Sequence, residues 1–242
     1  MDDVETLIKN ADRNFEKEKY IDALRDYLAA IEKVQDDDLK AEIAYKVSQI
    51  YHYLQKDSDE NSMKFAEIAL KIHEEKGEMD LQVLDLINIG TILIDSGKKE
   101  DGMRKLDEAI EKAKETNDDE LIMISLTSKA GIISDSDPDE AFKIYQDVAE
   151  KSEKIEDWED YFDALSGLIN ITRKKDEGKA FQMAMDAIDK LEKISATIKS
   201  KKERKEFIES FSYLYDTASD IAMALDNVED AIEIAKRLQN QA

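Results

Sequence analysis

The chain has 242 residues, of which 42% are apolar and 38% are charged, and its formal net charge is −23. This charge argues against binding to nucleic acid or to anionic membranes, because both need a basic protein face. With only seven glycines and one proline, few positions can break a helix, and the composition predicts an all-helical protein. The absence of cysteine excludes disulfides, thiolate zinc sites and cysteine nucleophiles.

The N-terminal stretch, MDDVETLIKN, is acidic and lacks the apolar core of a signal peptide. No apolar run approaches the roughly 20 residues that a bilayer-spanning helix needs. We therefore expect a soluble, cytoplasmic protein.

Helical periodicity divides the chain into six pairs of helices. The first helices of the pairs are expected at 2–17, 39–55, 80–96, 118–134, 158–173 and 201–225. The second helices are expected at 20–35, 59–76, 99–116, 138–156, 177–198 and 228–240. No shift in composition marks a linker, so we expect one domain over 1–242, with repeats at 2–35, 39–76, 80–116, 118–156, 158–198 and 201–240.

A small residue recurs at a fixed place in each helix pair. In the second helices these residues are Ala23, Ser62, Gly102, Ala141, Ala180 and Ala231, separated by 39, 40, 39, 39 and 51 residues. In the first helices they are Ala11, Ser48, Gly90, Ala130, Gly167 and Ser219. Small side chains let helix axes approach closely, so the antiparallel pairs are expected to stack and to bury their apolar faces together.

In this pattern the sequence resembles the tetratricopeptide repeat family, most clearly in its third repeat. The matching residues there are Asn88-Ile89-Gly90, Leu93, Gly97, Gly102, Leu106 and Ala109. The period near 40 is similar to the long-helix members of the family, although the closing proline and the early tryptophan are absent. The resemblance implies an all-α, right-handed α-solenoid of about six helix pairs whose first helices line a concave groove for a peptide or protein segment.

Carrying the family geometry over by helical position gives a set of expected groove residues. They are Tyr45, Gln49, His52 and Tyr53; Leu84, Ile87, Thr91 and Ile94; Ile124, Thr127 and Ser134; and Tyr161, Leu168, Ile171 and Thr172. These side chains are largely uncharged in a densely charged chain, which favours a groove for an amphipathic or extended peptide. The alternative is that the protein itself buries them, and periodicity does not separate the two possibilities.

Members of the family are known to bind the terminal carboxylate of a chaperone tail through cationic side chains of their first helices. These cations are missing here. The matching positions hold Ile8, Asp12, Gln49, Asn88 or Ile87, and Thr91. Acidic chaperone tails are therefore not expected to bind, and the expected partner is an apolar or basic peptide or protein.

The stretch ISDSDPDEAF holds the only proline and three alternating aspartates, Asp135, Asp137 and Asp139, as a calcium loop would. Glu140 stands where that loop needs glycine, and the bidentate glutamate is missing. The stretch instead predicts a helix start, with Asp137 as N-cap and Pro138 in the first turn.

No catalytic constellation is recognisable in the sequence. The two histidines, His52 and His73, do not form a zinc-binding helix motif, and no glycine-rich phosphate loop occurs. We therefore expect no enzyme activity, no metal and no cofactor.

The last repeat interval is about a dozen residues too long, and the surplus carries Lys199, Lys201, Lys202, Arg204 and Lys205. We expect these cations to be solvated at the turn of a longer terminal pair. The alternative is a contact patch for an acidic surface, including that of another copy.

Together these features predict a non-enzymatic interaction scaffold or adaptor that binds a peptide or protein segment in its groove. Two alternatives remain: a peptide-responsive regulatory sensor of the same architecture, and a self-assembling structural scaffold, a possible homo-oligomer.

Overall fold

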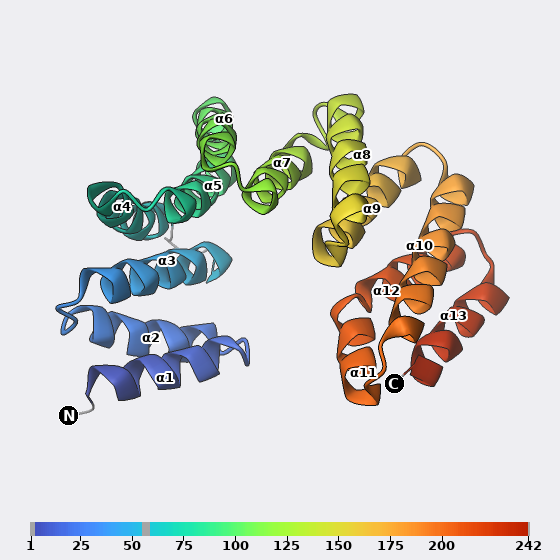
Figure 1. Cartoon of the computed structure of the whole chain (residues 1–242), viewed down its shortest axis with the longest axis horizontal. Helices are drawn as coiled ribbons and strands as arrows, with labels where there is room; N and C mark the ends of the chain where they lie inside the picture. Colours follow the sequence, from blue (N-terminus) through green and yellow to red (C-terminus); the bar gives the residue numbers. More distant parts are fainter. Residues whose placement is uncertain (1–2, 55–58, 242) are drawn as a thin grey trace. The chain divides into compact units, whose positions relative to one another are not determined.

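The computed structural model describes residues 3–54 and 59–241, in which thirteen helices and no strand occur (Figure 1). The helices are α1 (Val4–Phe15), α2 (Tyr20–Ile31), α3 (Asp37–Leu54), α4 (Asp59–Lys76), α5 (Met79–Asp95), α6 (Lys99–Thr116), α7 (Asp119–Ile133), α8 (Pro138–Ile155), α9 (Trp158–Arg173), α10 (Glu177–Thr197), α11 (Lys201–Ser210), α12 (Tyr213–Ala224) and α13 (Val228–Gln241). The expected all-α helical-repeat fold is confirmed. The expected helix ends at residues 2 and 55 lie outside the described residues.

The helix expected at 201–225 is wrong, because two helices, α11 and α12, occupy this segment. Phe211 leaves helical geometry, with φ −114° and ψ 21°. Its buried ring packs against Phe162 and Phe207, at centroid distances of 4.8 Å and 5.1 Å. This break in the helix allows the Phe211 ring to contact Phe162 on α9. Helical periodicity in the sequence does not predict the break.

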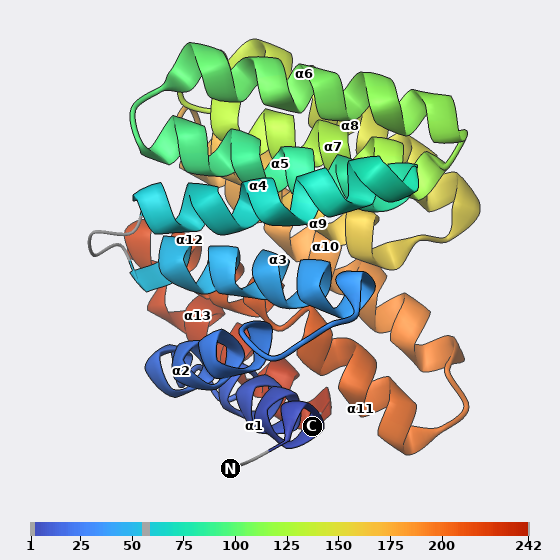
Figure 2. The same ribbon diagram turned by 90° about the vertical axis from the view of Figure 1, so that its left-hand side faces the viewer.

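The chain divides into two compact units, residues 1–128 and 129–242, with the boundary inside α7. In the described part of unit 1, the helices from α1 to α6 each pack against the next in the chain (Figures 1 and 2). In unit 2, α8 packs on α9, α9 on α10, α10 on α12 and α12 on α13. The expectation of one continuous domain stays a prediction.

Small residues lie at two close helix crossings in unit 1, as the repeat pattern predicts. Ser62 Oγ on α4 donates to the backbone carbonyl of Ser48 on α3 at 2.9 Å. At the α5–α6 crossing, a Cβ atom added to Gly102 would lie 2.5 Å from the carbonyl oxygen of Gly90. The predicted close approach of paired helices is therefore confirmed at these two crossings.

The aspartate-rich stretch begins α8, as predicted. Asp137 accepts a hydrogen bond from the backbone N–H of Glu140 at 3.0 Å, and Pro138 is the first helical residue. The flanking Asp135 and Asp139 form ion pairs with lysines of the α9–α10 turn. Each of the three aspartates thus has a protein partner of its own.

None of the described helices is both long enough and apolar enough to span a membrane.

Candidate functional site

The first helices of the second and third repeats, α3 and α5, lie side by side and are joined by polar contacts. Asn88 Nδ2 donates to Ser48 Oγ at 3.0 Å near the middle of the two helices. His52 Nε2 lies 3.0 Å from Asp95 Oδ2 near their C-terminal ends. These contacts fix the outer side chains of α3 and α5 relative to each other.

A second set of polar contacts joins α1 to α3. Lys46 Nζ lies 2.9 Å from both Asp12 Oδ1 and Glu42 Oε1. The hydroxyl of Tyr27 also donates to Asp12, and burial raises the pKa of Tyr27 well above its usual value. The first helices of three successive repeats are therefore tied together, with acidic side chains at the α1 edge.

The ten expected site residues in unit 1 all keep accessible surface. Tyr53 is 55% exposed, and the other nine are half-buried: Tyr45, Gln49, His52, Leu84, Ile87, Thr91, Ile94, Ile124 and Thr127. Eight of the ten come from the adjacent helices α3 and α5. We call these eight the α3–α5 face: Tyr45, Gln49, His52 and Tyr53 with Leu84, Ile87, Thr91 and Ile94.

Five of the expected groove residues lie in unit 2, and the four of them on α9 are buried within that unit. Tyr161, Leu168 and Ile171 on α9 are 8%, 5% and 2% exposed. Tyr161 packs edge-on against Trp158 and Phe162, and Thr172 is also buried, whereas Ser134 is half-buried. These four α9 side chains serve the core of unit 2, so the proposal below rests on unit 1.

The exposed stripe of α9 is polar and consists of Glu159, Asp163 and Asn170, spaced by four and seven residues. Asp163 accepts a hydrogen bond from the Tyr213 hydroxyl at 2.8 Å. The face of α9 that is accessible is therefore not the face that the sequence predicted.

Aromatic residues that were not expected at the site extend the α3–α5 face at one end. The Tyr20 ring lies 5.4 Å from the Tyr53 ring and 5.7 Å from the Phe15 ring. The neighbouring Ile21 is 75% exposed. Phe15 ends α1, and Tyr20 and Ile21 begin α2. The expected site residues come only from the first helices of the second to fifth repeats, so these three were not among them.

A buried ionisable pair lies between α4 and α5. His73 Nδ1 is 2.6 Å from Asp85 Oδ2, and both side chains are almost inaccessible. The other carboxylate oxygen of Asp85 has no hydrogen-bond partner among the described residues. Burial raises the pKa of Asp85 to about 6. Burial also raises the pKa of Tyr45 on the α3–α5 face, with a smaller contribution from the charge of Asp85.

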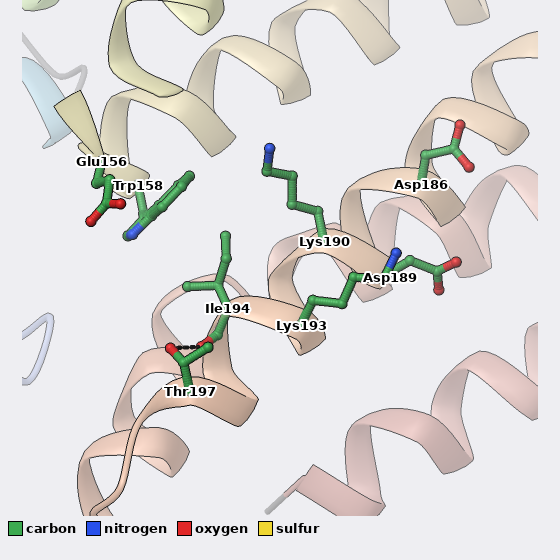
Figure 3. A pocket seen from close by; sticks show the side chains of 8 residues that line it. All are labelled: Glu156, Trp158, Asp186, Asp189, Lys190, Lys193, Ile194 and Thr197. Atoms are coloured by element: carbon green, nitrogen blue, oxygen red, sulfur yellow. Dashed lines mark hydrogen bonds between the residues drawn. The ribbon is translucent and has the colours of Figure 1, made fainter. Parts of the chain in front are cut away.

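Unit 2 contains a cavity of about 660 Å³, shown in Figure 3. It is lined by Glu156, Trp158, Asp186, Asp189, Lys190, Lys193, Ile194 and Thr197. The Lys190 ammonium lies 5.8 Å from the Trp158 ring centroid and 4.8 Å from the Tyr161 centroid, and it pairs with Glu153. The central cation of this cavity therefore already has its partners within the unit.

No protein-family model matches the sequence, and no curated protein matches it either. Several solved structures are similar in fold. A Rap protein in complex with competence and sporulation factor is 22% identical, with a TM-score of 0.65, over 97% of this chain and 73% of that one. Aspartyl phosphate phosphatase F from Bacillus subtilis is 17% identical, with a TM-score of 0.68, over 97% and 69%.

A signal-transduction ATPase from Pyrococcus horikoshii that carries a tetratricopeptide repeat sensor is 17% identical, with a TM-score of 0.64. The match covers 98% of this chain and 36% of the ATPase. At these identities the similarity concerns the fold. It confirms the tetratricopeptide-type resemblance at that level.

Proposed function

We propose that this chain is a non-enzymatic interaction adaptor that binds a peptide or an extended protein segment on the α3–α5 face. The proposal rests on one observation, the α3–α5 face. Its eight side chains include no Lys, Arg, Asp or Glu, and all of them keep accessible surface on two adjacent helices. The rest of the chain is densely charged, with 38% charged residues. An accessible patch of this kind on a helical-repeat scaffold is typical of a binding surface.

The charges around the face favour an apolar or basic partner. Asp95 borders it at the C-terminal end of α5, and Asp12 and Glu42, which share Lys46 as an ion-pair partner, border it on α1 and α3. Opposite charges at the rim of an interface steer association and discriminate between partners. A peptide with apolar anchors and flanking Lys or Arg fits this arrangement best. The similar Rap structure, which holds competence and sporulation factor, supports a peptide as the kind of partner.

The absence of enzyme activity is part of the proposal. Each histidine is paired with an aspartate, His52 with Asp95 and His73 with Asp85. The second of these pairs is buried, away from solvent and from any substrate. Among the described residues, neither histidine forms a hydrogen bond with a nucleophilic side chain.

A regulatory sensor is the second candidate function, because one similar protein carries its tetratricopeptide repeats as a sensor. In this version the bound peptide would change how the protein engages a further partner. The two functions share the α3–α5 face and differ in whether peptide binding alters another interaction.

Selection from a random linear peptide library on the immobilised full chain tests the proposed partner chemistry. We expect enrichment of peptides that combine apolar anchors with Lys or Arg, because the rim is acidic. Enrichment of acidic peptides, or of none, would contradict the proposal. A selected peptide that binds without changing any other interaction of the protein favours the adaptor over the sensor.

A further inference from the structure

A cavity of about 610 Å³ lies in unit 2, between the first half of α8 and the turn from α9 to α10. Its lining residues are Asp139, Phe142, Lys143, Gln146, Ile171, Thr172, Lys175, Asp176 and Lys179. The four residues from α8 have the spacing of a single helical face. The function proposed above does not involve this cavity, since the α3–α5 face belongs to unit 1.

Both acidic side chains of the cavity already have partners. Asp139 Oδ1 lies 2.8 Å from Lys175 Nζ, and this ammonium group lowers the pKa of Asp139 below its usual value. Asp176 is the N-cap of α10 and accepts a hydrogen bond from the backbone N–H of Lys179 at 2.9 Å. Lys175 is thus the ion-pair partner of Asp139, and the charge of Lys143 adds a smaller contribution to the lowered pKa of Asp139.

The other two ammonium groups of the cavity belong to Lys143 and Lys179. Within residues 3–54 and 59–241, neither is in ion-pair contact with a carboxylate. The lining holds three lysines against two aspartates, so the cavity has an excess of one positive charge in a chain with a net charge of −23.

The cavity also has an apolar wall. Phe142 is half-buried, and Ile171 is 2% exposed. Gln146 and Thr172 supply an amide and a hydroxyl on the same lining. Two of the nine lining residues are therefore apolar and the other seven are polar or charged, and a ligand with one apolar and one anionic part matches this division.

We propose that this cavity binds a small anionic ligand in which a carboxylate or phosphate group is attached to an aromatic or aliphatic group. The anion lies between Lys143 and Lys179, where two charge-assisted hydrogen bonds are available. The apolar part lies against Phe142 and Ile171. The two lysines come from successive repeats, 36 positions apart in the sequence, so the site requires both repeats.

Titration of the full chain with phenyl phosphate and with 3-phenylpropionate, followed by amide NMR shifts, tests the proposal. We expect saturable shifts at Gln146, Thr172 and Lys179 with at least one probe, and the stronger binder shows whether phosphate or carboxylate is preferred. Lys143→Gln/Lys179→Gln should weaken binding roughly tenfold or more, the effect of losing one or more charge-assisted contacts.

The control variant, Lys193→Gln/Lys236→Gln, makes the same change in net charge on exposed lysines outside the cavity and should bind like the wild type. Benzyl alcohol provides the ring without the anion and should not bind at the same concentration. Three results would overturn the proposal: no saturable shift, equal weakening in both double variants, or equal binding of the neutral probe.

Discussion

Glu156 ends α8 in the left-handed backbone region, with φ 61°. Gly77 and Gly97 hold the corresponding conformation after α4 and α5, with φ 74° and φ 80°. Glycine adopts this region without the steric cost that a side chain adds. Sequence periodicity located these turns, but it did not show which of them place a side chain under backbone strain.

Glu156→Gly should therefore stabilise the protein by about 1 kcal/mol, because the left-handed conformation costs a residue with a side chain about that much. The free energy of unfolding from urea denaturation measures the change. Glu150→Gly makes the same chemical change inside α8 and should destabilise by roughly 0.5–1 kcal/mol. A loss of stability in Glu156→Gly would contradict the prediction.

The buried Asp85 gives the protein a specific pH dependence. Burial raises its pKa from 3.8 to about 6, so the folded protein holds this proton more tightly than the unfolded chain does. The contribution to stability is fully present below about pH 4 and is lost as the pH rises through about 6. The sequence placed Asp85 on a helix, but gave no sign that it would be buried beside His73.

Asp85→Asn removes this titration. The free energy of unfolding of the wild type, minus that of Asp85→Asn, should fall by up to about 3 kcal/mol between about pH 4 and about pH 8. Urea denaturation at several pH values measures this difference. A difference that does not change with pH would show that burial does not raise the pKa of Asp85.

At the scale of elements, the crossing of α5 and α6 depends on Gly90 and Gly102. A Cβ atom added to Gly102 would lie 2.4 Å from the side chain of Ile94 and 2.5 Å from the Gly90 carbonyl oxygen. Real Cβ atoms do not approach backbone this closely, so the two helices would have to separate. The repeat pattern predicted this crossing because small residues recur in register along the sequence.

Gly102→Ala should destabilise the protein by about 1–3 kcal/mol, as overpacking of a close crossing does. At an open helical position the same change stabilises by up to about 1 kcal/mol. Gly131→Ala is the matched control, since its added Cβ would meet only the Tyr145 hydroxyl, at 3.4 Å. Thermal unfolding of both variants measures the effects. Equal melting temperatures would rule out the close crossing.

The elements also show where sequence reasoning fails. Eleven of the twelve expected helices correspond to single helices, because the apolar stripes are long and regular. The break at Phe211 and the orientation of α9 depend on contacts between side chains distant in the sequence, such as Phe162 with Phe211. On α3 and α5 the expected groove side chains keep accessible surface. On α9 they are buried, which the sequence did not predict, since a buried apolar face and a binding face look alike in the sequence.

At the scale of the whole molecule, the chain combines a net charge of −23 with an accessible face on two joined helices that holds no Lys, Arg, Asp or Glu. The strong charge favours solubility and the attraction of basic partners. The α3–α5 face provides the area that a peptide would bury. The basic segment at Lys199–Lys205 is largely solvated and partly paired within its own helix, as in Lys202 with Glu206.

The most direct test of the central claim is the affinity of a library-selected peptide for two double variants. Gln49→Lys/Thr91→Lys adds two cations to the α3–α5 face without removing a buried side chain, whereas Ser166→Lys/Asn170→Lys adds two to α9. With a basic, apolar peptide, isothermal calorimetry should show binding weakened at least roughly tenfold in the first variant, because like charges now oppose each other, and unchanged in the second. Equal affinity of the two variants would contradict peptide binding on the α3–α5 face.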